Sequence, residues 1–265
     1  MILGPSHMTL GCSDIDAGVR SLGNIGYHVQ FIDRNLPNDV AKVKFLSAPW
    51  TVHAIAYTRA NSGLPIELVS YDVHQPEEPG RFTGIFAGVE RDRQGAPNGN
   101  YRDILQPVVA ACGPAEIGSL PGFGVPAVFK NGAHGRGALV AAVLAVENLS
   151  KAKEFWCSAV GFRAGAYSME NADWQRLEFV SPVSAWCFTL VLVTSRRLSL
   201  PAFLDARGMA CLAFVCTDIC RDRADLLACG AEGAGIFNAR VNGRELLVEM
   251  LRSPDGAYLE LLQFA

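Results

Sequence analysis

The sequence lacks a strong excess of either charge, and it lacks any long hydrophobic run. Its 265 residues include 26 acidic and 23 basic residues, for a net charge of −3. Nucleic-acid surfaces rely on clustered Lys and Arg, so this balance predicts no nucleic-acid partner. No apolar run reaches the roughly 18 residues that a bilayer span needs, and the N-terminal residues show no signal-peptide pattern. We therefore expect a cytoplasmic protein with no membrane partner.

Several motifs that carry chemistry are also missing. The chain has no C-x-x-C pair, no G-x-x-x-x-G-K-[ST] phosphate loop, no G-x-S-x-G elbow and no H-E-x-x-H motif. Its eight cysteines are therefore expected to be reduced and to act as small hydrophobic residues. Histidine is scarce, with five residues, and none follows His134.

What is present is a faint threefold internal repeat. Each copy has a short apolar segment that ends at Asp or Asn, followed 12 or 13 residues later by Gly. The copies are Asp14 with Gly26, Asn148 with Gly161, and Asp218 with Gly230. Asp and Asn cap helices by accepting a backbone N–H bond, and Gly ends helices readily. Apolar segments after each glycine read as strands, so each copy predicts a strand–helix–strand–strand–strand (βαβββ) unit.

These patterns divide the chain into three parts. Residues 1–72 form the first βαβββ module, and residues 138–265 contain two further βαβββ modules. Residues 73–137 are rich in Gly and Pro, with one helical candidate at 101–112 and strand candidates at 82–89 and 125–129. This segment is either a degenerate module without its opening strand and helix or an extended linker with a partner-facing loop.

Five segments carry a resemblance to a known family. They are residues 7–10 (HMTL), 13–16 (SDID), 22–27 (LGNIGY), 66–69 (IELV) and 253–262 (SPDGAYLELL). Together with the repeat, they resemble the vicinal oxygen chelate superfamily, which includes glyoxalase I, bleomycin-resistance proteins and extradiol dioxygenases. The resemblance implies an α+β fold in which repeated βαβββ modules form curved mixed sheets around a cleft.

The resemblance also implies a divalent metal site. His7 occupies the place of a ligand on the first strand of a module, and Glu67 occupies the place of a carboxylate on its last strand. Glu260 matches Glu67 in the third module, and it could join the same ion if the first and third modules face each other. Glu67 and Glu260 are the candidate catalytic carboxylates.

The later modules depart from the pattern. Ala141 and Cys211 stand at the His7 position, and Thr189 or Leu190 replaces the glutamate of the second module. An extradiol dioxygenase site needs two His and one Glu in the C-terminal half, and the lack of His there excludes it. His53 lies on an expected strand of the first module, and it is either a third cleft residue or a half-buried sheet histidine.

Three functions remain open from sequence. The first is a metal-assisted isomerase or lyase that acts on a small oxygenated metabolite through an enediolate-type intermediate. The second is a metal-free drug-binding or metabolite-binding protein. The third is a non-catalytic scaffold or regulatory partner that uses residues 73–137 as its contact region. A homodimer is a further expectation of the resemblance.

Overall fold

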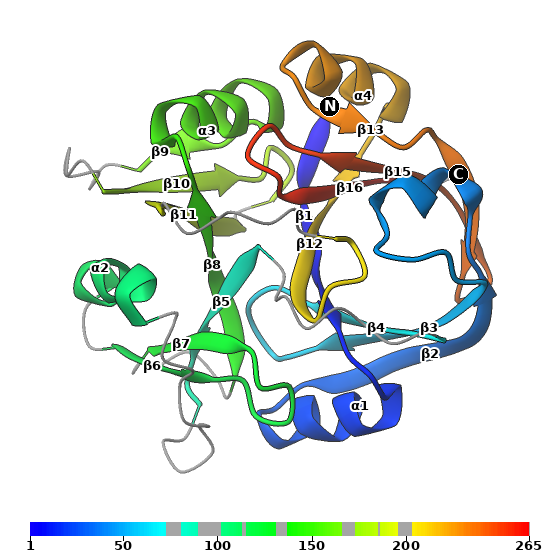
Figure 1. Cartoon of the computed structure of the whole chain (residues 1–265), viewed down its shortest axis with the longest axis horizontal. Helices are drawn as coiled ribbons and strands as arrows, with labels where there is room; N and C mark the ends of the chain where they lie inside the picture. Colours follow the sequence, from blue (N-terminus) through cyan, green and yellow to red (C-terminus); the bar gives the residue numbers. More distant parts are fainter. Residues whose placement is uncertain are drawn as a thin grey trace.

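The computed structural model describes residues 1–72, 81–89, 102–112, 115–130, 137–165, 173–184, 186–195 and 203–264. The repeated strand–helix–strand order expected from the sequence is present (Figure 1). In the part of the chain that is described, no helix is long and apolar enough to cross a bilayer.

The first unit contains four strands, one α-helix and a short 3-10 helix: β1 (Ile2–Gly11), α1 (Ile15–Asn24), β2 (His28–Pro37), η1 (Val40–Phe45), β3 (Val52–Arg59) and β4 (Ile66–Tyr71). The second unit has β8 (Ala138–Val146), α3 (Leu149–Phe155) with a π-helical turn η4 (Trp156–Val160), β9 (Arg163–Ala164), β10 (Trp174–Val180) and β11 (Cys187–Thr194). The third unit has β12 (Gly208–Cys216), α4 (Ile219–Ala228), β13 (Glu232–Gly233), β14 (Phe237–Val241), β15 (Arg244–Arg252) and β16 (Tyr258–Phe264).

The segment between the first and second units contains the helix and the two strands that the sequence indicated, together with one further strand. It contains β5 (Phe82–Ala87), α2 (Arg102–Cys112), β6 (Ala115–Ser119) and β7 (Pro126–Lys130). An opening strand and a helix are therefore present, in contrast to the degenerate module that the sequence suggested. The extended linker is also ruled out as a description of these residues, because β5 and β7 pair with each other and β5 pairs with β8.

The helix ends form as the repeat predicts. The side chains of Asp14, Asn148 and Asp218 accept N–H bonds from the first turns of α1, α3 and α4. Gly161 closes the second of these helices at a φ of 98°. A left-handed backbone of this kind is strained for residues with a Cβ, which explains why glycine stands there.

The strands form one continuous open sheet that curves into two halves, seen side by side in Figure 1. In the first half, the first and third units join because β1 pairs antiparallel with β12. Its strand order is β2-β3-β4-β1-β12-β16-β15-β14. In the second half, β8 pairs with β5, in the order β9-β10-β11-β8-β5-β7-β6. The first and third units therefore face each other across one concave surface.

Few contacts between strands join the two halves. One β12–β5 pair, Met209 with Phe82, connects the sheets. Tyr27 adds a buried link, because its hydroxyl donates to the Leu64 carbonyl at 3.1 Å and accepts from the Leu139 N–H at 2.9 Å. The main apolar core lies between and beneath the halves, and it includes Leu10, Trp156 and Phe214.

Candidate metal centre

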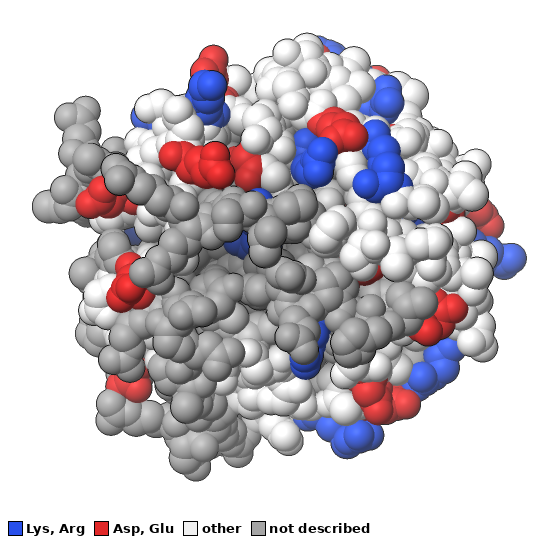
Figure 2. All heavy atoms as spheres, in the orientation of Figure 1, with Lys and Arg blue, Asp and Glu red and all other residues white. Residues whose placement is uncertain are grey.

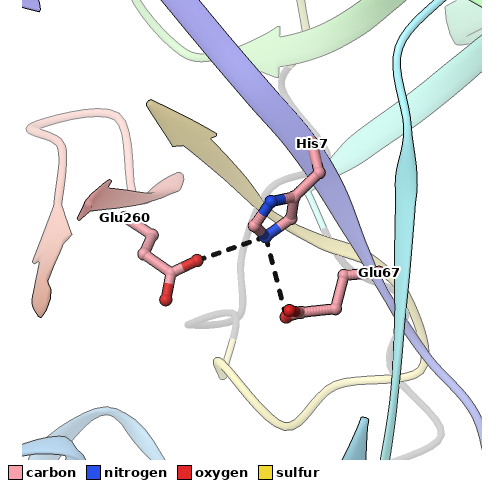
Figure 3. Close-up of side chains that lie close together, drawn as sticks. All are labelled: His7, Glu67 and Glu260. Carbon is pink, nitrogen blue, oxygen red and sulfur yellow. Dashed lines mark ion pairs between the residues drawn. The ribbon is translucent and has the colours of Figure 1, made fainter. Parts of the chain in front are cut away.

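Three side chains converge on the concave face of the first half. His7 projects from β1 between Glu67 on β4 and Glu260 on β16 (Figure 3). The His7 Nε2 atom lies 3.6 Å from Glu67 Oε1 and 3.4 Å from Glu260 Oε2. One ligand atom from each residue lies within 4.8 Å of the other two. The three residues that the sequence singled out as metal ligands are thus brought together.

Strand register explains this convergence. Side chains alternate between the two faces of a strand, so His7 and Thr9 share the concave face of β1. Glu67 pairs with Thr9 on the neighbouring parallel strand. Glu260 pairs with Ala213, and Ala213 in turn pairs with His7. The glutamates therefore approach His7 from the two sides of its strand.

The site is nearly sealed from solvent. His7 is 3% exposed and Glu260 is 8% exposed. In the described part of the chain, the buried Nε2 atom of His7 has no hydrogen-bond partner. A buried polar atom without a partner is costly, and an ion or ordered water commonly accounts for it. One imidazole nitrogen and two carboxylates also form a donor set that suits a divalent transition metal. The residues present therefore fit a metal ion.

The electrostatics of the triad are strongly coupled. Burial lowers the pKa of His7, but the nearby negative charges of Glu67 and Glu260 outweigh burial and raise that pKa to about 10. Burial raises the pKa of Glu67, yet His7 holds it below its ordinary value. Without a cation, a protonated His7 therefore balances part of the carboxylate charge.

Two neighbours orient the imidazole ring. The Ser6 hydroxyl oxygen lies 3.2 Å from His7 Nδ1, within hydrogen-bond distance. The Tyr57 ring packs edge-on against His7, with ring centroids 5.7 Å apart. A hydrogen bond from Nδ1–H to Ser6 leaves the lone pair of Nε2 free to face the carboxylates and bind a cation. Neither residue was predicted from the sequence. Tyr57 pairs with Glu67 on the adjacent strand, and this pairing brings its ring to the site.

The third unit has no histidine equivalent to His7, and the cluster of ligand residues has three members. Cys211 stands seven residues before the capping Asp218, as His7 stands before Asp14. Its thiol is fully buried, and burial together with the charges of Glu260 and Glu67 raises its pKa well above the usual range. The third unit therefore contributes Glu260 and a neutral thiol.

Short loops and apolar residues cover the concave face. Phe45 and Leu46 of the first unit cluster with Leu204, Met250 and Tyr258. The buried Asp205 carboxylate accepts bonds from the Ser47 N–H at 2.9 Å and the Ser47 hydroxyl at 2.7 Å. These contacts tie the segment after η1 of the first unit to residues 204–205 and to the third unit.

The comparisons with known proteins give a result only at the level of structure. No known family profile and no curated protein sequence matches the chain. Glyoxalase I from Zea mays matches with a TM-score of 0.55 and 14% identity, over 99% of this chain and 92% of that chain. A candidate dioxygenase from Bacillus subtilis matches with a TM-score of 0.60 and 11% identity, over 99% of this chain and 86% of that chain. This chain has the glyoxalase fold. The expected α+β fold and the family resemblance are thereby confirmed in architecture, and identities this low establish nothing finer.

The second half of the glyoxalase fold has no equivalent cluster in its described residues. Ala141 stands at the His7 position. In the first unit, Glu67 pairs with Thr9, which lies two residues after His7. In the second unit, the residue two positions after Ala141 is Val143, and it pairs with Val191. Val191 is therefore the equivalent of Glu67. The expectation that Thr189 or Leu190 replaces the glutamate is wrong, because the equivalent position lies one or two residues later, at Val191.

Helix α2 covers this second concave face. Its Leu105 and Val108 are buried in one apolar cluster with Ala141, Val143 and Val191. Helix α1, in contrast, packs on the opposite face of its sheet, where Leu22 joins Met8 and Leu10 in the main core. The glyoxalase fold of this chain therefore has one concave face that carries the polar cluster and one face filled by α2.

His53 lies on β3, four residues before Tyr57 and on the same side of the strand. It is half-buried, and burial followed by the charge of Lys42 lowers its pKa to about 4. It is not one of the three clustered ligand residues. Lys42 lies on η1, and nothing in its local sequence pattern predicts that this helix is close to the glutamates.

Proposed function

We propose that this protein is a metal-dependent isomerase or lyase that acts on a small oxygenated metabolite. The observation that carries the proposal is the convergence of His7, Glu67 and Glu260 within 4.8 Å on a sealed concave face. Three protein ligands leave coordination positions for substrate oxygens, as in catalytic metal sites generally. A bound divalent ion would supply Lewis-acid polarisation of a carbonyl or enolate oxygen.

The side chains would divide the remaining work. His7, held by Ser6, and Glu67 would fix the ion against β1 and β4. Glu260 is our choice for proton transfer, because apolar residues of the same face surround it. Its strand neighbours Ala213 and Met250 are buried, and Leu262 lies two residues further along β16. A substrate carbon resting on this wall would lie beside the Glu260 carboxylate, which could remove a proton and return it to the neighbouring carbon.

A second candidate function follows from the same triad. Protonated His7 and the two glutamates already form an ion-paired group without a cation. Such a group could be purely structural in a metal-free protein that binds a small ligand on the apolar wall. The two candidates differ in their requirement for metal.

Metal binding tests the proposal. The purified protein would be stripped with chelator and titrated with Mn²⁺, Co²⁺, Ni²⁺ and Zn²⁺ by calorimetry, with thermal unfolding followed in parallel. We expect one ion per chain and a higher unfolding temperature, because an ion that binds only the folded state stabilises it. His7→Ala combined with Glu67→Ala should abolish both effects, whereas Glu178→Gln, which changes a carboxylate of β10 in the second half, should abolish neither.

Proton transfer can be measured before the substrate is known. Metal-loaded protein would be incubated in D₂O with a panel of small hydroxy-carbonyl and oxo compounds, and loss of the proton next to the carbonyl would be followed by NMR. Exchange that requires both metal and Glu260 supports the enzyme. Absence of stoichiometric binding of any of the four ions by the wild-type protein would rule out the metal-dependent function and favour the metal-free binding protein.

A further inference from the structure

One lysine lies close enough to the candidate metal centre for the charges of Glu260 and Glu67 to act on it. Lys42 lies on the short helix η1 of the first unit, and its ammonium stands 5.5 Å from the ring centroid of Phe237 on β14 of the third unit. The side chain is half-buried. The helix is held in place because Phe45 is fully buried against Tyr258. Lys42 is therefore positioned by packing between the two units that supply the clustered ligand residues.

Lys42 has no ion-pair partner within 4.0 Å among the described residues, unlike Lys44 on the same helix. Lys44 is exposed and pairs with Glu232 at 3.3 Å. Burial lowers the pKa of Lys42, and the negative charges that oppose this effect are Glu260, Glu67 and, more weakly, Asp39. Asp39 is already engaged, since its carboxylate accepts the Ala41 N–H that begins η1.

A neutral imidazole lies near the ammonium. The charge of Lys42 is the largest electrostatic influence on His53 after burial, and the His53 ring already donates to the Leu36 backbone. His53 therefore supplies no negative charge that could pair with Lys42. Lys42 is the hydrogen-bond donor of this group, whereas Glu67 and Glu260 only accept.

The charge balance of the site changes when a cation binds. Without metal, Lys42 and protonated His7 face the two carboxylates. A divalent ion would neutralise Glu67 and Glu260 and would require neutral His7. The ammonium of Lys42 would then remain as a positive charge in a partly desolvated place, with the Phe237 ring nearby but no ion-pair partner within 4.0 Å in the described chain. An anion that arrives with the substrate would stabilise this charge.

We propose that Lys42 is a substrate-binding residue and that the substrate is a small carboxylic acid whose carboxylate pairs with it. The hydroxyl or carbonyl oxygen of the same molecule would face His7, Glu67 and Glu260. This inference names the substrate class of the proposed enzyme and therefore rests on the proposed function. The cover formed by Phe45, Leu46 and Leu204 favours a short acid.

Ligand binding to the whole protein tests this inference. The probes are 2-, 3- and 4-hydroxybutanoate and the uncharged amides of the same three acids, each titrated calorimetrically into Mn²⁺-loaded protein. For at least one acid, we expect Lys42→Met to weaken binding about tenfold to a hundredfold, because a hydrogen-bonded ion pair is lost. Binding of the matching amide should not change. Lys44→Met is the matched control and should bind the acids as the wild type does.

Two further variants guard against a purely structural explanation. Lys42→Arg keeps the charge and should retain most of the acid binding. Lys42→Gln replaces Lys42→Met if the latter does not fold, as judged by thermal unfolding. Removing the ammonium should also tighten Mn²⁺ binding a few-fold, because a nearby cation no longer repels the ion. A structural role alone would not produce that gain.

The inference and the proposed function can fail separately. If every acid binds Lys42→Met as tightly as the wild type, or if no acid binds the wild type better than its amide, the assignment of Lys42 is wrong while metal binding stands. If Mn²⁺ does not bind the wild type, the proposed metal-dependent function is wrong. The same acid titrations on metal-free protein would then decide whether Lys42 binds anions by itself.

Discussion

His7 and Glu260 lie near opposite ends of the chain, yet His7 Nε2 stands 3.4 Å from Glu260 Oε2. Their proximity depends on the antiparallel pairing of β1 with β12 and the parallel pairing of β12 with β16. The first and third units therefore build one site together. Neither unit alone holds all three ligands, which makes the candidate centre a product of how the units pair.

Ser6 offers a test of how the imidazole is oriented. We expect Ser6→Ala to lower metal affinity about tenfold or more, because the hydrogen bond that holds the ligand histidine is removed. Calorimetric titration measures this change. Ser70→Ala is a suitable control, since Ser70 lies on β4 and bonds to the Ser13 carbonyl away from the ion. Equal affinity of Ser6→Ala and wild type would show that Tyr57 and packing suffice to orient the ring.

Tyr27 tests the link between the two halves. Tyr27→Phe should destabilise the protein by about 1–3 kcal/mol, because the buried Leu139 N–H loses its acceptor. Urea unfolding followed by both circular dichroism and tryptophan fluorescence measures this loss. Thr58→Val, which removes a buried hydroxyl bonded within the first unit to the Ile66 carbonyl, should cost less. A Tyr27→Phe midpoint equal to that of the wild type would contradict the predicted role of this hydroxyl.

His53 predicts a specific acid sensitivity. Its pKa of about 4 in the folded protein lies below the ordinary value of 6.5, so the unfolded chain binds a proton more readily. The stability that depends on neutral His53 is complete above pH 6.5 and is lost as the pH falls towards 4. Because the side chain is partly exposed, we expect His53→Gln to remove at most about 2 kcal/mol of this acid-induced loss.

Urea unfolding of wild type and His53→Gln at several pH values between 4 and 7 measures that difference. The two curves should run parallel above pH 6.5 and converge or cross below it. Lys42→Met should raise the His53 pKa, which an NMR titration of the imidazole can follow. Parallel stability curves over the whole range would refute a depressed His53 pKa.

Ala141 tests whether the second concave face can be turned into a site. Ala141→His places a ligand type at the position equivalent to His7, but Leu105 and Val108 of α2 already fill the space. We expect a loss of about 1–3 kcal/mol from overpacking, and no second metal ion in a titration. Ala48→His, at an exposed loop position, should leave stability unchanged. A second tightly bound ion in Ala141→His would overturn the view that α2 fills this face.

Much of the local structure could be predicted from single residues. Helix ends depend on residues that are close together in the sequence. The caps Asp14, Asn148 and Asp218 and the glycine after each helix could therefore be predicted from their spacing alone. In the β5–α2–β6–β7 segment, the sequence indicated β5, α2 and β7, but neither β6 nor the pairing of the strands. Its strands pair with β8 and with each other, and such non-local pairing leaves little trace in a Gly-rich and Pro-rich stretch.

The sequence by itself determined which residues could bind a metal and which unit boundaries the caps and glycines mark. It also excluded a site with two histidines in the C-terminal half, because composition alone removes the ligands. Only the tertiary structure decided that the first unit pairs with the third, that Glu260 joins His7 and Glu67, that α2 fills the second face, and that Lys42 lies within electrostatic reach of the two glutamates. Strand partners, and helices packed over a sheet, are chosen by burial of apolar surface across the whole chain, and a local pattern carries no record of that choice.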